Sequence, residues 1–86
     1  MMQMTKQKLI AIQNNLEELD EVKLLDINYL EDLTDLFNKE LEDILNYEPE
    51  QVHTMIDSYL VMNDEDLEQL FVYNKMMRET LRLKIN

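Results

Sequence analysis

Apolar residues recur along this chain at intervals of three and four, the spacing that places side chains on one face of an α-helix. The pattern predicts a first helix from about Lys6 to Asp20, with Thr5 as its N-cap. A second and clearer amphipathic segment predicts a helix from about Tyr29 to Tyr47. Between them the pattern is interrupted, and the favoured interpretation is a break that ends near Asn28. The alternative is one continuous helix from Thr5 to Tyr47. The apolar seam of the first helix consists of Met2, Leu9, Ile12, Leu16 and Leu19.

The C-terminal half of the chain predicts two more helices. Pro49 suits the first position of a helix, so one helix is expected from Pro49 to about Met62. Asn63 then caps a last helix, whose first turn is acidic and whose C-terminal end is basic, as the helix dipole favours.

This last helix carries two apolar stripes on roughly opposite faces. The main stripe consists of Leu70, Tyr73, Met77 and Leu81, and the second of Val72, Met76 and Leu83. A helix with two apolar faces either lies centrally or contacts a second molecule. The second stripe is therefore the predicted oligomer interface, and a homodimer is the expected assembly.

The composition supports helices throughout. The 86 residues include no glycine and one proline, and the rest is rich in helix-forming residues. The predicted fold class is all-α, a small antiparallel helical bundle of four helices, or of three if the first two are continuous. A chain of this length forms one domain at most, so residues 1–86 are read as a single acidic helical domain.

The absence of cysteine excludes disulfides, thiolate metal sites and thiol catalysis. The longest apolar runs are far shorter than the ~20 residues that span a bilayer, and the N-terminus does not look like a signal peptide. Together these features predict a cytoplasmic protein.

No arrangement of residues indicates an enzyme, because no hydroxyl residue has a convincing histidine base. His53 follows Glu50 at the spacing of half a di-metal motif, which only a homodimer could complete. The ordinary interpretation is a surface histidine that pairs with Asp57 one turn later. The acidic run that follows Asn63 is explained by helix capping, since a calcium loop needs a glycine turn. No cofactor and no metal are expected.

Charge is the remaining functional signal. Residues 17–50 contain thirteen acids against Lys23 and Lys39, for a net charge of −11. This charge repels nucleic acids and anionic membranes and attracts a basic protein, including one that itself binds nucleic acid. On the second helix the acids are expected opposite the apolar face, where they form the predicted partner-binding surface: Glu31, Asp32, Asp35, Glu42 and Asp43.

These features favour a small acidic, non-enzymatic module that docks on a basic surface of a partner protein and inhibits or modulates it. Phage and bacterial inhibitors, antitoxins and DNA mimics are similar in size and charge, which is an analogy of type. A second hypothesis is a structural or adaptor subunit, or a small chaperone, that binds through apolar helix faces. A third is a carboxylate/histidine metal protein that forms a homodimer.

Overall fold

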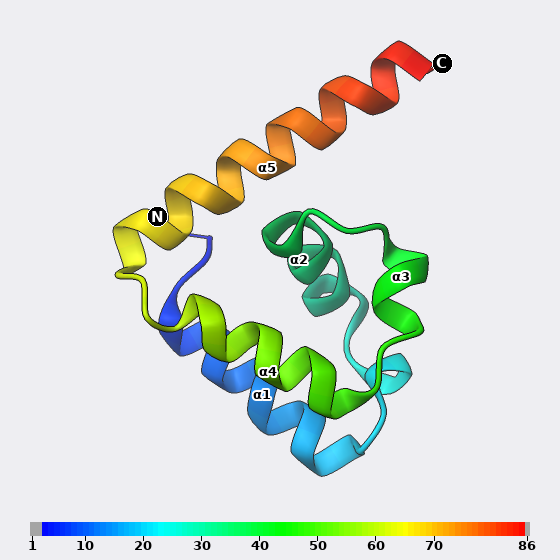
Figure 1. Ribbon diagram of the computed structural model, residues 1–86, viewed down its shortest axis with the longest axis vertical. Helices are drawn as coiled ribbons and strands as arrows, with labels where there is room; N and C mark the ends of the chain where they lie inside the picture. Colours follow the sequence, from blue (N-terminus) through cyan, green and yellow to red (C-terminus); the bar gives the residue numbers. More distant parts are fainter. Residues whose placement is uncertain (1–2, 86) are drawn as a thin grey trace.

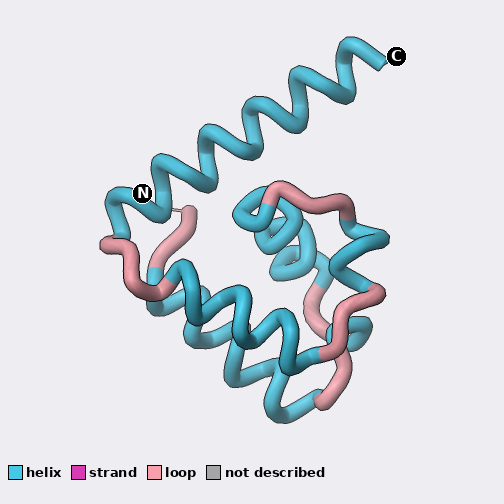
Figure 2. Tube along the Cα trace, viewed as in Figure 1, coloured by secondary structure: helices cyan, strands magenta, loops and turns pink. Residues whose placement is uncertain are grey.

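The computed structural model describes residues 3–85, with side chains as far as Leu81, and every regular element in this range is helical (Figures 1 and 2). The all-α prediction is confirmed. The elements are α1 (Lys6–Leu19), the 3₁₀ turn η1 (Val22–Leu24), α2 (Ile27–Phe37), α3 (Leu41–Leu45), α4 (Pro49–Tyr59) and α5 (Asp64–Ile85).

Two helix pairs organise the molecule. The first is α1 with α4, which lie side by side and run in opposite directions, and the second is α2 with α5 (Figure 1). The short α3 packs against both α2 and η1. Each of these elements contributes buried side chains to one apolar cluster, and the C-terminal half of α5 extends beyond the other helices.

The predicted starts of α1, α4 and α5 are confirmed, and side-chain hydrogen bonds cap α1 and α5. The Thr5 side chain accepts a hydrogen bond from the Lys8 backbone N–H at 3.1 Å, and α1 ends at Leu19. Pro49 begins α4, which ends at Tyr59, three residues before the predicted end. The Asn63 side chain accepts from the Asp66 backbone N–H at 2.8 Å and so caps α5.

The predicted break between the first two helices is confirmed, but the single helix from Tyr29 to Tyr47 is wrong. After Asp26 caps its first turn, α2 runs only to Phe37. Asn38 then adopts a left-handed conformation with φ of 55°, and the chain restarts as α3. A continuous helix of that length would extend about 28 Å. The turn instead folds α3 back onto α2 and η1, which buries Ile44 completely.

The predicted apolar seam of α1 is largely confirmed. Leu9, Ile12 and Leu16 are buried, Leu19 is exposed, and Met2 lies outside the described residues.

The predicted main stripe of α5 is wrong for three of its four residues, because only Leu70 packs against the core, where it is partly buried. Tyr73, Met77 and Leu81 are exposed. The buried line is formed instead by Leu67, Phe71 and Arg78. The reason is that α5 rests on α2 along this line, where the Asp35 carboxylate of α2 provides a partner for the buried Arg78.

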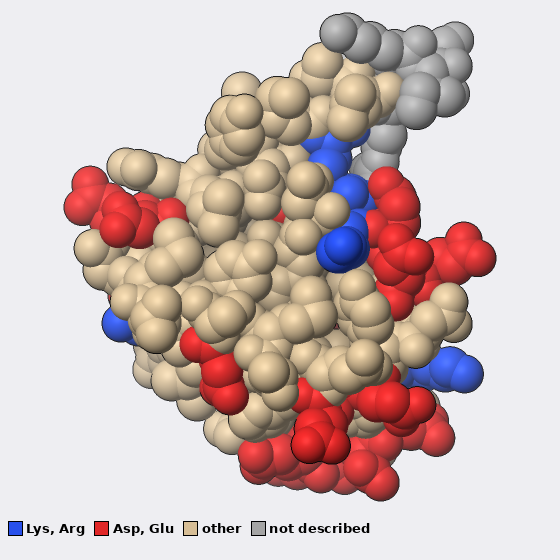
Figure 3. Space-filling view, viewed as in Figure 1, with Lys and Arg blue, Asp and Glu red and all other residues tan. Residues whose placement is uncertain are grey.

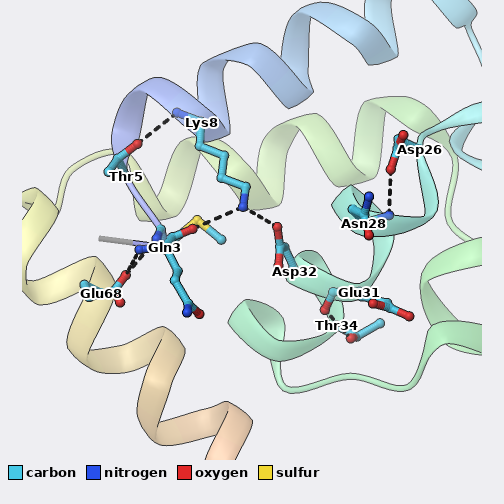
Figure 4. A network of polar contacts seen from close by, with 10 residues as sticks. Gln3, Thr5, Lys8, Asp26, Asn28, Glu31, Asp32, Thr34 and Glu68 are labelled. Atoms are coloured by element: carbon cyan, nitrogen blue, oxygen red, sulfur yellow. Dashed lines mark hydrogen bonds and ion pairs between the residues drawn. The ribbon is translucent and has the colours of Figure 1, made fainter. Parts of the chain in front are cut away.

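The first turns of α5 hold the N-terminal segment of the chain (Figure 4). The Glu68 carboxylate accepts hydrogen bonds from the backbone N–H groups of Gln3 and Met4, at 2.9 and 2.7 Å. Asp64 accepts from the Lys6 N–H at 2.8 Å. Bonds of this kind to a charged acceptor are stronger than neutral ones. They hold the segment that places Met4, which is fully buried, in the core.

Asn38 should tolerate glycine but not alanine, because a β-carbon is disfavoured at positive φ. We expect Asn38→Ala to lower the free energy of unfolding by about 1 kcal/mol. Asn38→Gly should leave it unchanged or raise it. Urea unfolding measures both effects. Asn46, a helix C-cap at φ −89°, is the control, and its replacement by glycine should give no gain.

The tyrosine ring of Tyr59 stacks on Phe37, with ring centroids 5.5 Å apart. Burial raises the pKa of Tyr59 above the ordinary value of 10.0. The folded chain therefore keeps this phenolic proton at a pH where the unfolded chain has lost it.

It follows that the free energy of unfolding decreases as the pH rises above about 10. Tyr59→Phe keeps the ring stack and removes the proton, so the decrease should be smaller in this variant. Urea unfolding between about pH 9 and pH 11 measures both slopes. Equal slopes would show that Tyr59 does not contribute to the pH dependence.

Candidate protein-binding surface

The five predicted partner-binding acids do not share one helix face, because the chain turns at Asn38. Glu31, Asp32 and Asp35 lie on α2, whereas Glu42 and Asp43 lie on α3. Glu31, Glu42 and Asp43 are exposed. The other two are half-buried and engaged within the molecule, so the expectation that all five face solvent was wrong.

Asp32 and Asp35 each pair with a cation from another helix. Lys8 of α1 reaches across to the Asp32 carboxylate and also donates to the Gln3 carbonyl (Figure 4). The Arg78 guanidinium of α5 lies 3.4 Å from Asp35 through Nε and 3.3 Å from the exposed Glu40 through its terminal nitrogen. Its Nε is buried and makes this ionic contact without a hydrogen bond. These carboxylates therefore hold helices together.

The structure brings three of the predicted residues together around one cavity between α2 and α5. The cavity measures about 310 Å³. Its charged lining consists of Glu31, Asp32, Asp35, Glu40, Glu79, Lys75 and Arg78. Since Asp32, Asp35 and Glu40 are paired with cations of the same molecule, this cavity offers less free negative charge than the sequence alone suggested.

A second concentration of acids arises where the end of α1 meets the start of α4. Two adjacent cavities there, of about 350 and 310 Å³, share Asp20 and Pro49 in their walls. We call their acidic residues the acidic edge: Glu17, Asp20, Glu21, Glu48 and Glu50. Acidic side chains gather over this lower end of the molecule in Figure 3. The sequence indicated a dense run of acids from residue 17 to 50. It did not indicate which of these acids would lie close together.

The end of α1 is an unfavourable place for negative charge. Glu17 and Glu18 occupy its last turn, Asp20 is its C-cap, and no basic residue is present in that turn. A helix C-terminus carries partial negative charge, so each acid there costs about 0.3–1 kcal/mol at low salt. Helix stability therefore gives no reason for this placement.

His53 lies beside the acidic edge and connects α4 to α1. Its Nε2 is 3.3 Å from the Glu17 carboxylate, and its Nδ1 is 3.6 Å from Asp57. The buried Gln13 amide donates to the His53 carbonyl and to Asp57, at 3.1 and 2.8 Å. The predicted pairing of His53 with Asp57 is confirmed. Among the described residues, no group of three His, Asp or Glu side chains is arranged to hold a metal ion.

The predicted oligomer interface lies partly on an exposed surface. Val72 and Met76 are exposed, and the side chain of Leu83 lies outside the described part of the chain. Tyr73 and Met77, which the sequence assigned to the opposite stripe, are exposed next to them. We call Val72, Tyr73, Met76 and Met77 the α5 apolar face.

Two further observations bear on the class of protein. None of the helices in residues 3–85 combines the length and the apolar character needed to cross a bilayer. Comparison of the chain with protein-family models, with curated proteins and with solved structures finds no match.

Removing the carboxylate beside Arg78 should destabilise the fold. Asp35→Ala leaves a guanidinium whose side chain is only 8% exposed without the less exposed of its two counter-ions, and we expect a loss of about 3 kcal/mol. The double variant Asp35→Leu/Arg78→Met should regain most of this loss, because it removes both charges and retains apolar volume. Denaturant unfolding of the wild type, Asp35→Leu, Arg78→Met and the double variant measures the coupling. Additive effects would show that the two residues do not interact.

Proposed function

We propose that this protein is a non-enzymatic binding module that docks on a basic surface of a partner protein and blocks or modulates it. The docking surface is the acidic edge, together with Glu42 and Asp43 of α3. These two acids are exposed, and α3 packs against η1, which begins directly after Glu21. The surface therefore combines acids from three helices and the connection that follows α1.

The observation that supports this proposal most strongly is the position of acids at the end of α1. If negative charge served only to keep the chain in solution, it would be equally effective at sites that do not oppose the helix dipole. Acids that lower stability at one place are typical of a binding surface, where function and stability conflict.

The chemistry of such a surface is long-range attraction. A concentration of like charge raises the rate at which an oppositely charged partner associates, and this effect decreases steeply with ionic strength. A protein surface that binds nucleic acid is one basic surface of this kind. The inhibitor, antitoxin and DNA-mimic forms of the proposal all act by covering that surface.

One observation favours a second candidate function. The α5 apolar face would let the chain act as an adaptor or small chaperone that binds through apolar contacts. Binding of that kind depends weakly on salt. The two functions are therefore separable by experiment.

The test begins with a partner recovered by affinity capture from the source cells and then purified. The rate at which this partner associates with the wild type is compared with its rate of association with an edge variant, which carries Asp20→Asn, Glu21→Gln and Glu50→Gln. These substitutions spare Glu17, which contacts His53, and Glu48, which precedes the first helical residue of α4. Asparagine retains the left-handed conformation that Asp20 adopts at φ 55°. We expect the association rate to fall by about tenfold at low salt, with a shallower salt dependence.

Two controls make the result specific. A variant with Glu31→Gln, Glu65→Gln and Glu79→Gln has the same change in net charge at exposed sites away from the edge, and should keep most of the wild-type rate. Met76→Glu disrupts the α5 apolar face and should also leave the rate nearly unchanged. An edge variant that associates at the wild-type rate would contradict the proposal. Loss of binding in Met76→Glu alone would establish the adaptor function instead.

A further inference from the structure

The α5 apolar face has no covering element among the described residues, although its side chains are large. Tyr73 and Met76 are each 62% exposed, and Val72 and Met77 lie beside them. On a helix these four positions share one side, opposite the buried line of Leu67, Phe71 and Arg78. Tyrosine and methionine are enriched in the contact regions of protein interfaces.

We infer that this face binds the α5 helix of a second copy of the chain in antiparallel orientation. The inference is independent of the partner-docking surface proposed above. It rests on the position of the face within α5 and on the distribution of charge along that helix.

The apolar face is centred on the midpoint of α5. The helix runs from Asp64 to Ile85, and the four residues of the face are arranged symmetrically about the peptide bond between Asn74 and Lys75. A two-fold axis through this point would bring the apolar faces of two copies into contact over the same residues. Such a contact is isologous, as in most homodimers, and closes on itself.

The charges of α5 suit only the antiparallel arrangement. Its first turn carries Asp64, Glu65 and Asp66. Its last turns carry Arg82 and Lys84, with no acid after Glu79. An antiparallel pair places the acidic start of each helix beside the basic end of the other, twice in one dimer. A parallel pair would place like charges together at both ends, which is unfavourable.

The same charges argue for a second copy as the occupant. The chain as a whole has a net charge of −11, so two copies repel over most of their surfaces. The segment from Gln69 to the C-terminus is net positive, and without Arg78, which is buried against Asp35, it still has three basic residues against one acid. The C-terminal half of α5 also extends beyond the other helices (Figure 1). Two copies that pair through antiparallel α5 helices therefore make contact where opposite charges attract each other. The acidic remainder of each copy lies at the opposite end of the dimer from that of its partner.

The expected dimer is weak. One helix pair buries less than about 1,200 Å², which is at the low end for specific interfaces. We therefore expect a dissociation constant in the range of about 1–100 µM.

Analytical ultracentrifugation of the full chain, from about 1 to 500 µM, tests the assembly. The wild type should convert from monomer to dimer across this range, with a dimer that weakens at high salt. Met76→Glu should raise the dissociation constant at least about tenfold, because it places two carboxylates near the two-fold axis. Val61→Glu is the matched control. Val61 is apolar and 83% exposed but outside the face, so this variant should dimerise like the wild type.

Charge reversal tests the orientation. Glu65→Lys/Asp66→Lys and Arg82→Glu/Lys84→Glu should each weaken the dimer, and the quadruple variant should restore it. In a parallel dimer, or in one that does not use the helix ends, all these variants would associate equally. Circular dichroism confirms that each variant is folded. A wild type that stays monomeric at the highest concentration, or reversals without effect, would overturn the inference.

Discussion

An excess of negative charge governs how the carboxylates of this chain are used. The chain has nineteen acidic residues against eight lysines and arginines, so most carboxylates have no basic side chain to pair with. Several carboxylates, including those of the Asp26, Asp64 and Glu68 side chains, accept hydrogen bonds from backbone N–H groups. Others hold the few cations that cross between helices, as Asp32 holds Lys8 and Asp35 holds Arg78. What remains is exposed, and the fold determines where it gathers.

Three of the acids engaged in contacts between elements connect α5 to the rest of the chain. Asp64 and Glu68 tie the N-terminal segment to the first turns of α5, and Asp35 holds its middle through Arg78. Between these attachments only Leu67 and Phe71 are fully buried apolar residues of α5. The helix is thus attached along one narrow line, which leaves most of its circumference, including the α5 apolar face, in solvent.

The two proposed surfaces differ in their physics. The acidic edge acts at a distance, by attraction that salt weakens, and suits a basic partner. The α5 apolar face acts only on contact, through apolar burial and a charge pattern that fits a second copy. The edge lies at the end of α1, whereas the face lies at the middle of α5 on the side away from the core. A dimer formed through α5 would therefore present two acidic edges to a partner, which would raise the avidity for a repeated basic surface.

Features that depend on neighbouring residues could be predicted from the sequence. The all-α class, the caps at Thr5 and Asn63, and the start of α4 at Pro49 follow from helix periodicity and from hydrogen bonds that close within one turn. Features that depend on residues far apart in the chain could not be predicted and emerge only when the helices pack. The turn at Asn38 exists because it lets Ile44 enter the core, and Arg78 is buried because Asp35 lies across from it. The acidic edge formed for the same reason: packing of α1 against α4 brought together acids that are separated by some thirty residues in sequence, and no local pattern encodes that contact.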